Sequence, residues 1–141
     1  MTKTIIVDAS AAASWLLGSQ STRAAESFLL ELDAYHLAAP DIFQWEIGNL
    51  LLRQARRDPQ LDLGMAYQRL DEFQIEMARP LGRRQLRRLS GVAADRGLSL
   101  FDASYLWLCL GLDAGLASRD AALLSAASAA GQPIFDLRDQ E

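Results

Sequence analysis

The chain has 141 residues, half of them hydrophobic, so it is long enough to bury a core without disulfide bonds or a structural metal. It contains one cysteine and one histidine, which excludes an internal disulfide and a Cys/His zinc site. Its formal net charge of −4 argues against sequence-blind binding of duplex nucleic acid through a broad basic surface, although metal-binding carboxylates would contribute to that charge.

Helices and strands are predicted from the spacing of apolar residues, and their ends from glycine, proline and capping residues. The predicted elements are, in chain order, a strand at 4–7, helices at 11–17 and 22–33, a strand at 36–39, helices at 42–57 and 61–76, a short strand within 75–81, helices at 83–96 and 101–112, a strand at 116–118, a helix at 121–130 and a strand at 133–135. Ser10 is the predicted N-cap of the first helix. This alternation of helices and short apolar strands predicts an α/β fold with a central parallel sheet.

The organisation of the chain is expected to be simple. We see no internal repeat, linker or low-complexity segment, so we expect one domain over residues 1–141. No signal peptide is recognisable, and no stretch approaches the roughly 20 apolar residues that span a bilayer. We therefore expect a cytoplasmic protein. Cys109 lies in an apolar run and is expected in the core.

Two acidic residues follow predicted strands. Asp8 ends the strand at 4–7, and Asp120 comes just after the strand at 116–118, where a helix begins. Sites in open α/β sheets gather at the carboxyl ends of the strands, so both side chains are expected at the same edge. Because two carboxylates at the same edge of a sheet repel each other, their clustering favours a bound cation.

Two further acidic residues lie in apolar helical sequence, Glu46 within residues 43–50 and Asp102 within residues 98–107. A carboxylate in such surroundings is a helix cap, a member of a buried ion pair or a metal ligand. Simpler interpretations stay open: a solvated residue beside an arginine of the same helix for Glu46, a first-turn charge for Asp102 and an N-cap for Asp120.

Four short motifs occur in order along the chain. They are Asp8-Ala9-Ser10 after an apolar strand, Trp45-Glu46-Ile47-Gly48-Asn49-Leu50-Leu51, Phe101-Asp102-Ala103-Ser104-Tyr105-Leu106, and Ala117-Ser118-Arg119-Asp120. In this order and at these separations they resemble the PIN-domain family, and more narrowly the VapC toxins of toxin–antitoxin pairs. The resemblance extends from about Ile5 to Leu137.

The resemblance implies a three-layer α/β/α PIN-like fold and a ribonuclease that uses Mg²⁺ or Mn²⁺ and leaves a 5′-phosphate and a 3′-hydroxyl. The positions that match the metal-binding carboxylates are Asp8, Glu46, Asp102 and Asp120. The positions that match supporting polar residues are Ser10, Asn49 and Ser118. Hard cations take oxygen ligands, so neither histidine nor cysteine is required, and His36 is expected at a strand edge or on the surface. Ser14 departs from the basic residue that many relatives carry.

The resemblance also implies an RNA substrate, a VapB-like antitoxin and a homodimer. Self-association is expected through the apolar faces of the helices at 11–17 and 42–52. An antitoxin helix is expected in a groove lined by the helices around Trp15, Phe43 and Trp45. The three tryptophans are otherwise expected in the core or an interface.

Arginine clusters are the candidates for contacts with RNA phosphates. One cluster, at positions 53, 56 and 57, follows Glu46 on the same helix, and another, at 83, 84, 87 and 88, begins a later helix. Each could equally be a solvated face with surface ion pairs.

Three other functions fit parts of the pattern. A receiver-type signalling domain would need a lysine at a strand end, but the only lysine is Lys3, before the first strand. A HAD-like phosphatase requires Asp-x-Asp after the first strand, and the second of those positions is Ser10 here. A PIN fold that binds RNA or protein without cleavage, or a housekeeping RNA-processing nuclease, remains open.

Overall fold

The computed structural model describes residues 2–139. Its helices and strands are, in order, β1 (Lys3–Val7), α1 (Ala9–Leu16), α2 (Arg23–Leu29), β2 (Tyr35–Ala39), α3 (Ile42–Arg57), α4 (Leu63–Glu72), β3 (Glu76–Met77), α5 (Arg83–Arg96), α6 (Leu100–Leu112), β4 (Gly115–Ser118), α7 (Ala121–Ala129) and β5 (Ile134–Asp136). Two 3₁₀ turns lie at Gly18–Gln20 (η1) and Leu32–Ala34 (η2). No helix in this part of the chain is both long and apolar enough to cross a membrane.

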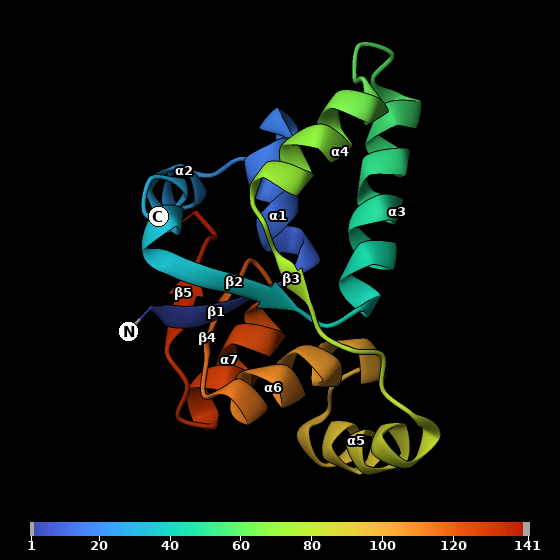
Figure 1. Cartoon of the computed structure of the whole chain (residues 1–141), viewed down its shortest axis with the longest axis vertical. Coiled ribbons are helices and arrows are strands. Elements are labelled where there is room, and N and C mark those ends of the chain that lie inside the picture. Colours follow the sequence, from blue (N-terminus) through green and yellow to red (C-terminus); the bar gives the residue numbers. More distant parts are fainter. Residues whose placement is uncertain (1, 140–141) are drawn as a thin grey trace.

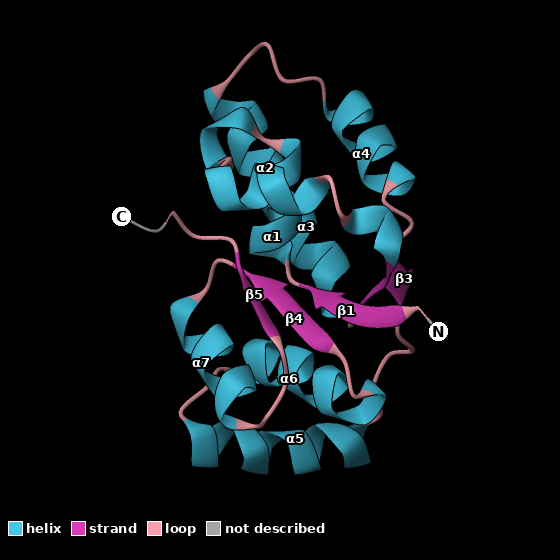
Figure 2. Cartoon of the chain, turned by 90° about the vertical axis from the view of Figure 1, so that its left-hand side faces the viewer, coloured by secondary structure: helices cyan, strands magenta, loops and turns pink. Residues whose placement is uncertain are grey.

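The five strands form one parallel sheet in the order β3-β2-β1-β4-β5 (Figure 1). Helices α1 to α4 lie on one side of this sheet and α5 to α7 on the other (Figure 2). The predicted α/β fold with a central parallel sheet and helices on both faces is therefore confirmed. Because both faces are covered, the buried part of β1, Ile5–Val7, is apolar throughout.

The strand order places a topological switch at the centre of the sheet. From β1 the chain moves outward through β2 and β3, and it later returns to the other side of β1 with β4 and β5. The connections that leave β1 and β4 therefore diverge, which opens a crevice at the carboxyl ends of these two strands. Asp8 follows β1, and Asp120 lies two residues after β4.

Several predicted element boundaries are wrong by a few residues. Asp8, rather than Ser10, is the N-cap of α1, because its carboxylate accepts a hydrogen bond from the backbone N–H of Ala11 at 2.9 Å. The helix predicted at 22–33 ends at Leu29 and is followed by η2. In contrast, α3 and α5 have the predicted bounds, and α5 ends at Gly97 in the left-handed conformation.

Candidate functional site

A pocket of about 350 Å³ opens at the carboxyl ends of β1 and β4, and we call it the acidic pocket. Four carboxylates from four different elements line it: Asp8, Glu46, Asp102 and Asp120. Of the predicted supporting residues, Ser10 and Asn49 also line it. Ser118 does not line the pocket but contacts Asp8 from behind. The structure thus brings the four predicted acidic residues together in one pocket.

Asp8 is the most deeply placed of the four, with only 5% of its surface exposed. Its Oδ1 accepts hydrogen bonds from the N–H of Ala11 and from the hydroxyl of Ser10, the latter at 2.7 Å. Its Oδ2 accepts a hydrogen bond from the hydroxyl of Ser118. Both carboxylate oxygens are therefore fixed, and the side chain has one orientation.

The two serine hydroxyls are committed as donors to Asp8. Ser10 Oγ accepts a hydrogen bond from the N–H of Arg119 at 2.9 Å, and Ser118 Oγ accepts one from the N–H of Asp120 at 2.8 Å. Since a hydroxyl has one hydrogen, each serine directs that hydrogen to the carboxylate. This network ties the end of β4 to the end of β1 and holds Asp120 near Asp8.

Burial nevertheless raises the pKa of Asp8 to about 6, since loss of solvation outweighs the hydrogen bonds that favour its charged form. The charge of Asp120 raises the pKa further. Asp8 is therefore a carboxylate whose charge is only partly compensated by the protein.

Glu46 is held by a residue to which the sequence analysis assigned no role. The hydroxyl of Tyr105, whose side chain is 1% exposed, donates a hydrogen bond to Glu46 Oε1 at 2.6 Å. Burial and the charge of Asp102 raise the pKa of Glu46, whereas this hydrogen bond lowers it. The signal that could have found Tyr105 is its position three residues after Asp102, on the same face of an apolar helix, where a buried hydroxyl requires a partner.

Asp102 and Asp120 each lie at the start of a helix. Ser99 caps α6 by accepting a hydrogen bond from the N–H of Asp102 at 3.0 Å, and Asp102 lies in the first turn. Burial, and next the charge of Asp120, raise the pKa of Asp102. Asp120 itself caps α7 by accepting a hydrogen bond from the N–H of Leu123 at 3.0 Å. The first-turn position of Asp102 and the capping role of Asp120 are thus confirmed, and both residues also line the acidic pocket.

The acidic pocket presents oxygen donors, the ligand type that hard divalent cations take. All four are carboxylates, and the pKa values of Asp8, Glu46 and Asp102 are all raised by burial together with a neighbouring negative charge. Within residues 2–139, the His, Cys, Asp and Glu side chains do not come together as a group of three or more that could hold a metal ion. Mg²⁺ and Mn²⁺ need few protein ligands because Mg²⁺-type cations retain several waters, so a partly open carboxylate set suits them.

Comparison with known families identifies the family of this chain. The sequence model of the PIN domain matches residues 5–129. The chain belongs to the PIN domain family. PIN domains are generally nucleases, so the family membership supports a hydrolase that acts on nucleic acid.

A solved structure supports the fold of this PIN domain. The crystal structure of PAE2754 from Pyrobaculum aerophilum superimposes with a TM-score of 0.68 and 23% sequence identity, over 96% of this chain and 92% of that one. At this identity the similarity shows the fold alone. A comparison with curated protein sequences finds no significant match.

Other residues singled out in the sequence occupy different surroundings in this PIN domain. Arg53 lines the acidic pocket. The arginines of α5 belong to a helix that packs outside α6 (Figure 2). They do not line the acidic pocket. His36 is exposed on β2, as expected, and pairs with Glu76 of β3 at 2.7 Å. Cys109 is buried, also as expected.

The three aromatic residues named for the antitoxin groove differ in exposure. Trp15 and Phe43 are buried, whereas Trp45 is 75% exposed. Phe43 lines a pocket of about 190 Å³ between α3 and α4, so a groove along these helices stays a prediction. The apolar face of the first helix is unavailable for self-association, because residues 11–17 are all buried within the chain. Sequence spacing identified these apolar faces but not the helices that already cover them.

Proposed function

We propose that this PIN domain is an endoribonuclease that depends on Mg²⁺ or Mn²⁺. The observation that carries the proposal is the acidic pocket, in which the carboxylates that follow β1 and β4 meet those of α3 and α6 at the topological switch of the sheet. Clustering them without a cation is unfavourable, so their convergence needs a reason other than stability.

The residues divide into those that would hold the cation and those that hold the ligands. We assign Asp8 and Asp102 as direct ligands, with Asp120 binding directly or through a water. A bound divalent ion supplies an activated water and neutralises charge at the scissile phosphate. Glu46 completes the ligand set or orients the attacking water, and the hydrogen bond from the hydroxyl of Tyr105 favours its charged form and holds it in place.

The experiment is a cleavage assay on a mixed set of structured RNAs. We expect cleavage by the purified, folded protein with Mg²⁺ or Mn²⁺, none with EDTA, and products that carry a 5′-phosphate and a 3′-hydroxyl. Asp8→Asn is expected to abolish cleavage while the circular dichroism spectrum is kept. If the folded protein cuts no RNA with either metal, the proposal of a general ribonuclease fails, and a PIN module that binds without cutting becomes the better account.

We further propose that the chain is the cytoplasmic toxin of a VapBC-type pair, inhibited by a VapB-like antitoxin. The motif order supports this, and so does the chemistry of the pocket, because a partner's Arg or Lys would satisfy the carboxylates in place of the metal. We expect growth arrest when the chain is expressed alone and recovery of a small partner when it is expressed from its native locus. Expression of active enzyme without arrest and without a partner would instead indicate a housekeeping nuclease.

A homodimer is proposed on the resemblance to this family. Leu110 and Leu112, at the carboxyl end of α6, are about half exposed and could contribute to such an interface. Light scattering at micromolar concentration should give the mass of two chains. A mass of one chain over the whole concentration range would contradict the proposal.

A further inference from the structure

A second pocket adjoins the acidic pocket, and the two share one residue. This apolar pocket, of about 270 Å³, lies between the start of α3, the segment before α5, and the facing sides of α5 and α6. Leu81, Leu89 and Trp107 contribute to its apolar wall. Phe101 lines both pockets, so it forms the ridge between them.

Helices α3 and α6 both extend from one pocket to the other. On α3, Ile42 lines the apolar pocket and Glu46 the acidic pocket. Trp45 lies one turn after Ile42 and immediately before Glu46. On α6, Phe101 stands immediately before Asp102. Each helix therefore carries an aromatic residue next to a carboxylate of the acidic pocket.

These two aromatic side chains are unusually open to solvent. Trp45 is 75% exposed and Phe101 is 55% exposed. The ring contacts inside the protein involve a different set of residues: Trp15, Phe28, Tyr35, Phe73 and Phe135. A single exposed apolar side chain needs no explanation, but Phe101 is an exposed ring that lines a pocket of carboxylates, which suits it to stack a flat ligand. Trp45 lines neither pocket and is a second exposed ring on the helix that carries Glu46.

The chemistry of the apolar pocket indicates what that ligand is. Besides its apolar wall, the pocket is lined by Asp41, Arg79 and Ser104. The side chain of Asp41 makes no capping hydrogen bond to α3, and the hydroxyl of Ser104 donates to the carbonyl of Phe101, so both keep oxygens free to accept. An apolar wall with a few donors and acceptors matches a nucleobase, which has apolar faces and polar edges.

We propose that Phe101 and Trp45 stack an unpaired nucleobase of the substrate, and that the apolar pocket receives this base when a neighbouring phosphate lies at the acidic pocket. The inference rests on the proposed nuclease function, because it requires a nucleic acid in the acidic pocket. It assigns a positioning and specificity role to residues outside the carboxylate set. A base paired in a duplex would not present its face to these rings.

The test measures binding rather than cleavage, in an Asp102→Asn background that is expected to cut too slowly to consume the probe. The probes are a fluorescent single-stranded RNA hexamer and six versions of it, each with one abasic position. We expect Phe101→Ala to weaken binding of the intact hexamer about tenfold. For one of the abasic hexamers the same substitution should have no effect, because the missing base and the missing ring remove the same contact.

Matched variants separate stacking from other effects. Phe101→Tyr and Trp45→Phe keep a ring and should bind the intact hexamer as the background protein does, whereas Trp45→Ala should weaken it. Met65→Ala removes a similarly exposed apolar side chain from α4, outside both pockets, and should have no effect.

The inference alone is overturned if Phe101→Ala has the same effect on all seven hexamers, or none, while the unmodified protein cuts RNA. It is also overturned if either alanine variant changes the mass of the protein in solution, because the rings would then belong to a protein interface. Failure of the unmodified protein to bind or cut any RNA overturns the proposed function and this inference together.

Discussion

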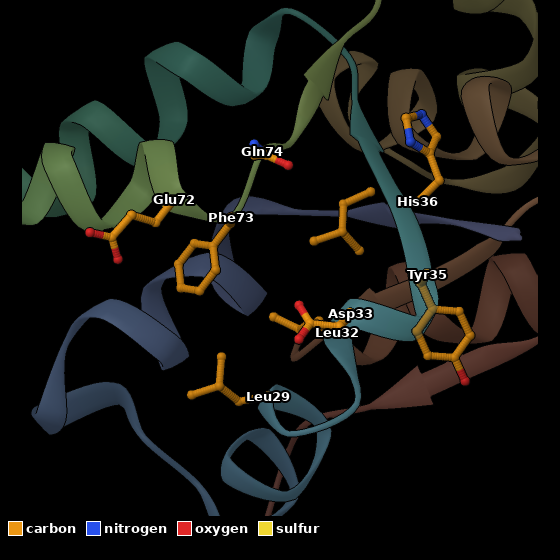
Figure 3. A pocket seen from close by; sticks show the side chains of 9 residues that line it. Leu29, Leu32, Asp33, Tyr35, His36, Glu72, Phe73 and Gln74 are labelled. Carbon is orange, nitrogen blue, oxygen red and sulfur yellow. The ribbon is translucent and has the colours of Figure 1, made fainter.

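Two pockets of similar volume, both lined by carboxylates, lie at different places on the sheet. The acidic pocket, of about 350 Å³, lies at the carboxyl ends of β1 and β4. The other, of about 400 Å³, lies at the amino end of β2, and we call it the amino-edge pocket. Its carboxylates, Asp33 and Glu72, come from η2 and from the end of α4 and are exposed (Figure 3). Asp8, in contrast, is buried.

The difference follows from the direction of the helices. At the acidic pocket, α1, α6 and α7 begin, and their free backbone N–H groups accommodate negative charge. At the amino-edge pocket, α4 ends, so the nearby backbone groups are carbonyls. A carboxylate can therefore be partly buried in the acidic pocket, whereas in the amino-edge pocket it stays solvated. A candidate cation site is therefore distinguished by the direction of the surrounding helices and by the burial of its carboxylates, rather than by the number of acidic residues.

The largest expected effect tests that comparison directly. Asp102→Asn should lower RNA cleavage at least about a hundredfold, because it removes a charge that would hold the metal. Asp33→Asn, the matched change in the amino-edge pocket, should leave the rate within about twofold. Initial rates with Mn²⁺ at saturating RNA would measure both. Equal losses in the two variants would remove the distinction between the pockets.

The second prediction concerns stability and pH. The pKa of Asp8 in the folded protein, about 6, lies above its ordinary value of 3.8. The folded state therefore holds this proton more tightly than the unfolded chain does, so the free energy of unfolding falls as pH rises from about 4 to about 6 and stays lower above that. Asp8→Asn should make the metal-free protein more stable by ~2 kcal/mol at pH 8 and not at pH 4.

Urea denaturation in EDTA at the two pH values would measure this difference. Asp33→Asn serves as the control and should give the same stability as the unmodified protein at both. Added Mn²⁺ should stabilise the unmodified protein more than Asp8→Asn. A stability gain in Asp8→Asn that is independent of pH would contradict the argument from burial.

The third prediction concerns the hydroxyl that fixes Asp8 from behind. Ser118→Ala should weaken the apparent affinity for Mn²⁺ about tenfold, because Asp8 Oδ2 loses its hydrogen-bond donor. Ser118→Thr keeps the hydroxyl and should restore most of the affinity. Ser90→Ala, whose hydroxyl bonds only to the carbonyl of Leu86 on an exposed helix face, is the control. Unchanged affinity in Ser118→Ala would show that Asp8 does not need this support.

The smallest expected effect is on the pH profile. Tyr105→Phe removes the hydrogen bond that lowers the pKa of Glu46, so this pKa should rise further. The acid limb of the cleavage rate should then move to higher pH, with a few-fold loss of rate near neutral pH. Tyr35→Phe, in the amino-edge pocket, should not move it. A uniform loss of rate without a shift of the limb would indicate a structural role only.

The sequence predicted the elements better than their ends. The bounds of α3 and α5 follow from unbroken apolar spacing and from the stop signals Asp58 and Gly97. The N-cap of α1 was misplaced because Asp8 and Ser10 are both good capping residues, and the choice depends on a contact with Ser118 from the other half of the chain. Local patterns do not contain that contact.

For the site, the sequence by itself determined which residues have the right chemistry and where they stand relative to strand and helix ends. Asp8 and Asp120 could be placed at one edge because parallel strands share their carboxyl ends. The tertiary structure alone decided that Glu46 accepts from Tyr105 and that Trp45 is exposed while Trp15 is buried. The reason is physical: periodicity shows which face of a helix is apolar, but burial and pairing depend on which other elements cover that face.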